Sequence, residues 1–186
     1  MDKFTFERLS IPDLVLVRPR KFSDDRGFFM ETWTAPVFRD AGISAAFVQD
    51  NHSLSRKRGT IRGLHFQRQP FAQAKLVRIV RGSVYDVGVD LRRSSPTYGK
   101  WAAVTLTAEA GEQLFIPAGF AHGFCTLEPD TEMVYKVDAL YSAECDGGLA
   151  WNDPDLAIDW PVRPDEVSLS AKDQKLPPFA GFASPF

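Results

Sequence analysis

The stretch Gly111-Glu-Gln-Leu-Phe-Ile-Pro117-Ala-Gly119-Phe-Ala-His122 decides the fold of this chain of 186 residues. It predicts one short strand that ends at Pro117, because proline cannot continue a central strand, and a turn at Gly119. A second strand then begins at about residue 120. The turn delivers His122 to the mouth of a small barrel, so this stretch predicts a β-barrel with an ionisable group at its opening.

Short strand-like runs separated by Gly, Pro and Asp continue on both sides of this stretch. Strands are expected at 14–17, 28–33, 47–52, 60–67, 75–80, 83–91, 101–107, 113–116, 120–127 and 131–138. Arg81-Gly82 is expected to close a hairpin, and 34–42 to form a short helix that Thr34 caps and Gly42 closes. From about Asp153 the chain is expected to wrap the barrel in turns and a short helix. We predict one all-β domain that spans 1–186.

The composition narrows the class of protein. The 15 Phe and 4 Trp favour strands and barrel interiors over helical bundles. A net charge of −2 and a pI near 5.9 give no reason to expect a nucleic-acid partner. No run reaches the roughly 18 apolar residues of a membrane span. The charged N-terminus has no apolar run as long as that of a signal peptide. With only two cysteines, we expect a soluble cytoplasmic protein.

Three ionisable residues on strand-like segments suggest proton-transfer chemistry. They are His65 within 62–67, Lys75 at the start of 75–80, and Tyr135 within 131–138. Converging on one cavity, an imidazole, an ammonium and a phenol could remove a proton, hold the resulting charge and return a proton. These are the groups needed to epimerise a carbon beside a carbonyl.

The spacing of Arg62 and His65 predicts a local irregularity. On a regular strand these two side chains point to opposite faces. For both to reach one ligand, the strand must bend or bulge near Gly63, where glycine makes that easy.

The opening stretch also resembles the second cupin motif, G-x5-P-x-G-x2-H. Metal-binding cupins add a His-x-His and a Glu in their first motif, whereas this chain offers only His65 in that region. With three histidines in all and no such ligand spacing, we expect a cupin-type double-stranded β-helix, or jelly-roll barrel, without a metal.

Over nearly its whole length the chain resembles the dTDP-4-dehydrorhamnose 3,5-epimerases of bacterial deoxysugar biosynthesis. The matching segments, in order and with compatible spacing, are 25–31, 47–53, 62–67, 72–78, 116–124, 135–136, 151–154 and 169–173. The resemblance implies a homodimer through the N-terminal strands, a dTDP-linked sugar substrate, and no metal or other cofactor.

The resemblance also implies roles for individual residues. His65 would be the general base with Asp173 as its partner, Tyr135 the acid on the opposite face of the sugar, and Lys75 the group that stabilises the enolate. Arg26, Arg62 and Lys172 would face the diphosphate or nearby groups. The rest of the substrate site would comprise Phe29, Glu31, Gln49, Asn51, His122, Tyr141 and Asp146. Ala74 and Asp146 stand where the family commonly has Gly and Glu, and the shorter Asp146 puts the nucleotide contacts there in question.

Each of these residues also has a structural interpretation. Taken singly, His65 would be a hydrogen-bonded core histidine, Lys75 a surface charge, Tyr135 a barrel-wall aromatic and Asp173 a helix cap. For His122 a ligand contact and a hydrogen-bonding strut are equally plausible. The alternative functions are epimerisation of one centre only (C3 or C5), a metal-dependent cupin enzyme, and a sugar-nucleotide binding barrel without activity. The matched series of motifs favours the 3,5-epimerase.

Overall fold

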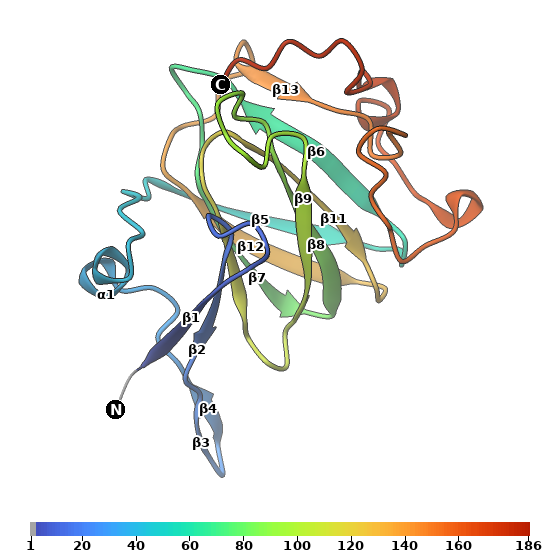
Figure 1. The fold of residues 1–186 in the computed structure, drawn as a ribbon. Coiled ribbons are helices and arrows are strands. Elements are labelled where there is room, and N and C mark those ends of the chain that lie inside the picture. Colours follow the sequence, from blue (N-terminus) through green and yellow to red (C-terminus); the bar gives the residue numbers. More distant parts are fainter. Residues whose placement is uncertain (1–2) are drawn as a thin grey trace.

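Two antiparallel sheets are packed face to face in the computed structural model, which describes residues 3–186 (Figure 1). In spatial order, the six-stranded sheet contains β1 (Phe4–Arg8), β2 (Val15–Pro19), β10 (Gln113–Ile116), β7 (Lys75–Arg81), β12 (Thr131–Val137) and β5 (Gln49–Ser55). The five-stranded sheet contains β13 (Asp146–Gly148), β6 (Ile61–Gln67), β11 (Phe120–Thr126), β8 (Ser83–Asp90) and β9 (Trp101–Thr107). This arrangement confirms the expected all-β, jelly-roll type of barrel.

The apolar residues form three layers, because both sheets are covered on their outer faces. The central layer between the sheets includes Leu16, Val77, Leu106, Phe124 and Met133. The outer face of the six-stranded sheet packs against the helix α1 (Ala35–Asp40), whose Phe38 is buried.

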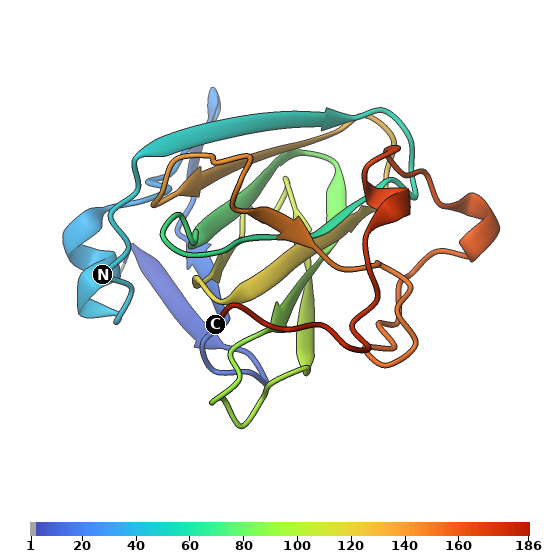
Figure 2. The same ribbon diagram turned by 90° about the horizontal axis from the view of Figure 1, so that it is seen from above.

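The C-terminal segment covers the outer face of the five-stranded sheet, seen as the orange and red chain in Figure 2. Its aromatic side chains Trp160, Phe179, Phe182 and Phe186 pack in the apolar layer on that face. This segment contains the two 3-10 helices η1 (Pro164–Glu166) and η2 (Asp173–Lys175). The expected wrapping by turns and a short helix is therefore confirmed.

Some local expectations were wrong. The run 28–33 is a strand only as far as Phe29, in the small hairpin of β3 (Phe22–Asp24) and β4 (Gly27–Phe29). Arg81-Gly82 does not close a hairpin, since β7 and β8 belong to different sheets and Gly82, at φ +77°, turns the chain between them. Thr34 precedes α1, but its hydroxyl donates to Glu31 and makes no capping bond. Strands β1, β3 and β13 were not predicted.

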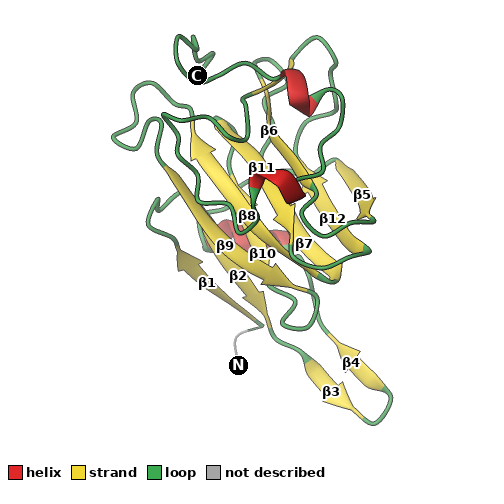
Figure 3. Ribbon diagram, turned by 90° about the vertical axis from the view of Figure 1, so that its right-hand side faces the viewer, coloured by secondary structure: helices red, strands yellow, loops and turns green. Residues whose placement is uncertain are grey.

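The β3–β4 hairpin projects away from the two sheets (Figures 1 and 3). It carries three exposed aromatic side chains, Phe22, Phe28 and Phe29, with 45–65% of their surface accessible. Aromatic side chains gathered at an exposed site are typical of a surface that contacts another molecule.

A bulge interrupts β6 where the sequence predicted an irregularity. His65 pairs with His122 and Arg62 pairs with Phe124, so Gly63 and Leu64 together oppose the single residue Gly123. Gly63 has a φ of +121°, which L side chains rarely adopt. Because the bulge adds one residue, Arg62 and His65 both face the same cavity rather than opposite sides of the sheet.

The substitution Gly63→Ala is expected to lower the free energy of unfolding by about 3 kcal/mol or more. A methyl group there would lie 2.6 Å from both Gly123 Cα and His122 O, in addition to straining the backbone. Gly181→Ala is the matched control, with φ +75° and no atom within 4 Å of the added carbon. Urea denaturation should show a loss of only about 1 kcal/mol for the control. Equal losses in both variants would contradict the close contact at the bulge.

Candidate active site

An imidazole–carboxylate pair lies at the centre of the site. His65, on β6, places Nε2 at 2.7 Å from Oδ1 of Asp173, the first residue of η2. The two residues are 108 positions apart in the chain, and the C-terminal segment brings them together. With Nε2–H donated to Asp173, the free lone pair of a neutral His65 is on Nδ1.

Asp173 is held as a carboxylate although its side chain is only 4% exposed. Burial opposes its ionisation, but hydrogen bonds from His65, Ser170 and the Gly63 backbone, together with the charge of His65, lower its pKa below the ordinary value. An ionised Asp173 stabilises positive charge on the imidazole, which is what a base needs while it carries a proton.

Lys75 and Tyr135 reach the same space from the six-stranded sheet. Lys75 opens β7, and its Nζ makes a long contact of 3.5 Å with the backbone oxygen of His65. Burial lowers the pKa of Lys75 to about 8, and the charges of Asp86 and Asp146 limit the fall. Burial also raises the pKa of Tyr135, on β12, against the opposing charge of Arg62, so its phenol keeps its proton at neutral pH.

A second imidazole–carboxylate pair lies deeper in the barrel. His122 pairs with His65 across β11 and β6, and its Nε2 lies 2.9 Å from Oδ1 of Asp86, on β8. Burial lowers the pKa of His122, and the charges of Lys75 and His65 act in the same direction against that of Asp86. His122 is therefore a neutral imidazole at neutral pH.

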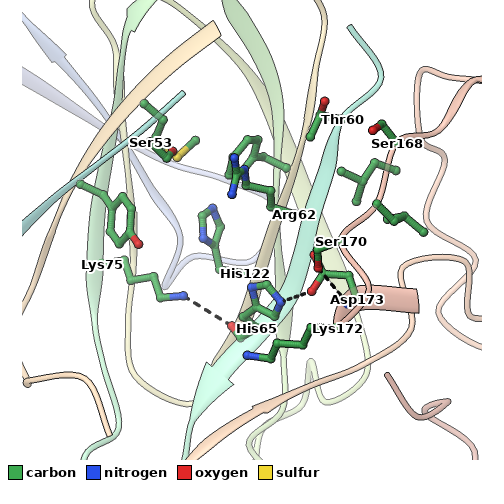
Figure 4. A pocket seen from close by; sticks show the side chains of 15 residues that line it. Ser53, Thr60, Arg62, His65, Lys75, His122, Ser168, Ser170, Lys172 and Asp173 are labelled. Carbon is green, nitrogen blue, oxygen red and sulfur yellow. Dashed lines mark hydrogen bonds and ion pairs between the residues drawn. The ribbon is translucent and has the colours of Figure 1, made fainter. Parts of the chain in front are cut away.

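Two adjoining cavities meet at these residues. The inner cavity, of about 400 Å³, extends into the barrel past His122 (Figure 4). Its other lining residues are Ser53, Thr60, Ile61, Arg62, Phe124, Met133, Ser168, Leu169, Ser170 and Asp173. The outer cavity, of about 410 Å³, is lined also by Gln49, Asn51, Phe66, Gln67, Gln73, Tyr141 and Asp146. Both cavities share His65, Lys75, Tyr135 and Lys172.

The polar groups around the cavities are partly engaged with one another. Arg62 donates to Ser55 Oγ and to the backbone oxygen of Leu54, which fixes the direction of its guanidinium. Asp146 accepts hydrogen bonds from the Tyr141 hydroxyl, at 3.2 Å, and from Lys172. The Tyr141 ring remains 62% exposed, so one face of the outer cavity is a free aromatic surface.

Within one chain, three of the predicted substrate-binding residues lie outside these cavities. Arg26 forms an ion pair with Asp24 at the tip of the β3–β4 hairpin, and Phe29 is 65% exposed on the same hairpin. Glu31 bonds to Lys3 and Thr34 instead. Because the hairpin points away from the barrel (Figure 3), these residues do not line the cavities of their own chain, and their substrate-binding role stays a prediction.

The sequence reasoning did not identify Asp86, nor most of the inner cavity's lining such as Ser53, Phe124 and Met133. The alternation in Val84–Asp90 could have indicated Asp86, since it shares a strand face with the buried Val84. A polar residue in an alternating strand is normally assigned to the solvent face. Here the carboxylate lies on the inner face of β8 with Val84, and the C-terminal segment covers the opposite face, that of Val87 and Val89.

The geometry is that of an acid–base enzyme. It joins an oriented base, a half-buried ammonium and a protonated phenol in a cavity large enough for a small molecule. Among residues 3–186, no group of three or more His, Cys, Asp or Glu side chains is arranged to hold a metal ion. No helix within the same residues is long and apolar enough to cross a membrane.

The chain belongs to the dTDP-4-dehydrorhamnose 3,5-epimerase family, whose model matches residues 8–181. A curated family member from Sinorhizobium fredii is 54% identical over 177 residues, which are 95% of this chain and 90% of that protein.

Solved structures of family members have the same fold as this chain. The 3,5-epimerase of Bacillus anthracis, with TDP and PPi bound, has a TM-score of 0.91 at 49% identity over 95% of this chain and 99% of that one. The epimerase of Legionella pneumophila, in complex with dTDP-4-keto-L-rhamnose, has a TM-score of 0.92 at 40% identity over 97% and 95% of the two chains.

Lys75 should titrate near pH 8 in the free protein, well below the ordinary lysine value of about 10.4. The direction follows from burial, which disfavours the charged form, so the ammonium is present at neutral pH and is lost as the pH rises through 8. The ¹³Cε shift of ¹³C-labelled lysine, assigned by its absence in Lys75→Gln, measures this midpoint by NMR. A midpoint close to that of model peptides would mean that Lys75 is solvated rather than buried.

Proposed function

We propose that this protein epimerises C3 and C5 of dTDP-4-dehydro-6-deoxy-D-glucose to give dTDP-4-dehydro-L-rhamnose. The observation that carries the proposal is the convergence of the His65–Asp173 pair with Lys75 and Tyr135 around one cavity. The family and the ligands named for its solved members, TDP with PPi and dTDP-4-keto-L-rhamnose, support the substrate class.

The reaction begins with removal of a proton beside the C4 ketone. The carbonyl acidifies the C–H bonds at C3 and C5, and Nδ1 of His65 accepts the proton. The electron pair of the broken C–H bond moves into the ring, and the C4 oxygen becomes an enolate. Asp173 stabilises the imidazolium and keeps its ring oriented, and a positioned base of this kind contributes about 10²–10⁴-fold in rate.

The enolate is then stabilised and protonated from the other side. The Lys75 ammonium provides positive charge to the C4 oxygen in a site that is largely closed to water, a contribution whose removal typically costs roughly 10²–10³-fold. Tyr135 reaches the cavity from the opposite sheet, and its phenol donates a proton to the face opposite His65. The carbon is thereby inverted. His65 then releases its proton to water and Tyr135 takes one up from water, and repetition at the second centre completes the reaction.

The two cavities divide the substrate between them. The sugar occupies the inner cavity, where the acid–base groups lie, and the nucleoside occupies the outer one. Lys172, which lines both cavities, and Arg62, which lines the inner one, suit the diphosphate because both are cationic. The exposed Tyr141 ring suits stacking on the base. In this chain the carboxylate of Asp146 already binds Tyr141 and Lys172, so we propose that it orients these two side chains.

His65→Ala should abolish deuterium incorporation into the sugar, since no other group takes the proton. The measurement is ¹H NMR of dTDP-4-keto-6-deoxyglucose with the enzyme in D₂O, following exchange at C3 and C5. The wild type is expected to exchange both positions. His52→Ala is the matched control, because His52 is an exposed histidine paired with Glu132 outside both cavities, and its exchange should equal that of the wild type.

Exchange at one carbon alone in the wild type would replace the proposal with a single-centre epimerase. Failure to exchange at either carbon would reject this substrate. Full exchange by His65→Ala would retain the substrate but reject His65 as the base.

We also propose that the protein is a homodimer through its N-terminal strands and that the β3–β4 hairpin of each copy completes the other copy's site. The hairpin carries the exposed Phe22, Phe28 and Phe29 and projects from its own barrel. Exchange of such an element between copies would bring Arg26 and Phe29, and with them Glu31, to a partner's outer cavity.

We propose a cytoplasmic location as well. Cys125 and Cys145 are both free thiols, which suits the reducing conditions of the cytoplasm.

Mixing two inactive variants tests this exchange. His65→Ala and Arg26→Ala should each lose most activity alone, but a mixed dimer holds one site free of both substitutions. After co-refolding of equal amounts, about a quarter of the sites should be intact, and activity should return to that fraction of the wild type. If Arg26 served its own chain instead, no mixed dimer would contain an intact site and activity would stay absent.

A further inference from the structure

Asp86 is a buried carboxylate for which the proposed proton transfers give no role. Its side chain is 0% exposed on β8, and it shares the inner strand face with the core residue Val84. The neighbouring position on β11 is Phe124, which belongs to the same apolar core. A carboxylate taken out of water among such residues costs several kcal/mol unless charges and hydrogen bonds compensate it.

The hydrogen bonds of Asp86 compensate only part of this cost. Oδ1 lies 2.9 Å from His122 Nε2, but Oδ2 has no hydrogen-bond partner, and it is the one buried side-chain nitrogen or oxygen within residues 3–186 in that condition. Burial lowers the pKa of His122, so the imidazole is neutral and does not cancel the negative charge. A positive charge from elsewhere must balance it.

Lys75 is the cation that the structure leaves for this purpose. The titratable and charged groups that surround it, from every element packed there, are His65 and Arg62 on β6, Asp86 on β8, His122 on β11, Tyr135 on β12, Asp146 on β13, and Lys172 and Asp173 at η2. Two of the three carboxylates already have partners, because Asp146 is paired with Lys172 and Asp173 with His65. The third, Asp86, has an ion-pair contact among the described residues with His122 alone, and its charge acts on Lys75 from a longer distance.

We propose that Asp86 is a positioning residue for the epimerisation, holding a negative charge inside the barrel that keeps the Lys75 ammonium charged and holding His122 with Nδ1 toward the sugar. This inference rests on the proposed function. Asp86 does not touch the reacting carbon. It acts through its two neighbours.

Each neighbour then has a defined role at the substrate. The charged Lys75 donates a hydrogen bond to the C4 oxygen as the enolate forms. His122 donates Nε2–H to Asp86, so its Nδ1 lone pair accepts a hydrogen bond from a sugar hydroxyl and fixes the ring. The proton removed by His65 never passes through this pair, so Asp86 and His122 end each turnover as they began.

The variant Asp86→Asn tests the charge while nearly preserving shape. By the lysine ¹³C NMR titration, the midpoint of Lys75 should fall from about 8 to a clearly lower pH, because the charge that opposes the effect of burial is gone. At pH 8 we expect kcat to fall on the order of 10²-fold with KM little changed, and the optimum to move to lower pH. An unchanged Lys75 midpoint would overturn the proposal.

Asp90→Asn is the matched control. Asp90 is equally buried on the same strand, but it is bonded to Arg92, Ser95 and Thr97 outside the cavities. Its loss should reduce stability without moving the Lys75 midpoint. A shift of that midpoint in Asp90→Asn as large as in Asp86→Asn would assign the effect to general loosening of the fold and reject the role of Asp86.

His122→Asn keeps the test decisive if Asp86→Asn does not fold. It removes the imidazole and leaves the carboxylate, so kcat should fall while Lys75 still titrates at about pH 8 or above. A fall of the midpoint in this variant would overturn the proposal. The titration needs no substrate, so it judges Asp86 even if the wild type fails to exchange deuterium, which would reject only the proposed function.

Discussion

The bulge between Arg62 and His65 is the constraint on which the site depends. An unbroken ladder would send one of these side chains into the cavity and the other to the opposite face of the five-stranded sheet. By opposing two residues of β6 to Gly123 alone, the bulge turns both side chains to the same cavity. Gly63, within the bulge, donates a backbone hydrogen bond to Asp173, so one irregularity places the base and supports its partner. Only a residue without a side chain fits there, because Gly123 and the His122 carbonyl are too close.

The electrostatics of the cavity follow from its position between two covered sheets. Two hydrogen-bonded imidazole–carboxylate pairs lie there, His65 with Asp173 and His122 with Asp86, and both imidazoles engage their carboxylate through Nε2. In each ring the nitrogen that remains free is Nδ1. Yet the two rings differ in depth, since the side chain of His65 is 29% exposed and that of His122 only 8%. A single arrangement thus provides one imidazole that can exchange protons with a ligand and another that serves as a fixed acceptor.

Much of the barrel was predictable from the sequence. Runs in which polar and apolar residues alternate, separated by Gly and Pro, indicate strands of a sheet that packs on one face. The turn at Gly119 and the irregularity at Gly63 were predictable for a related reason, since glycine marks places where other residues do not fit. The strand β13 was missed because three residues with two glycines carry no alternation. The prediction of a hairpin at Gly82 was wrong because a tight turn has the same sequence pattern in two cases. The next strand can pair with the preceding one in the same sheet, or it can belong to the other sheet, as β8 does here. Asp86 escaped notice because a carboxylate in an alternating strand is normally assigned to solvent, whereas here it lies on the inner strand face with Val84.

The late position of Asp173 in the chain has a consequence for biosynthesis. Every strand of both sheets lies before residue 149, so a chain that lacks η2 still contains every strand of the barrel, bulge included. Such a chain would hold His65 without its carboxylate. Only when the last segment leaves the ribosome and packs across the five-stranded sheet is the pair complete. Premature termination or proteolytic trimming near residue 170 would therefore keep every strand but leave His65 without its partner and uncover part of the five-stranded sheet.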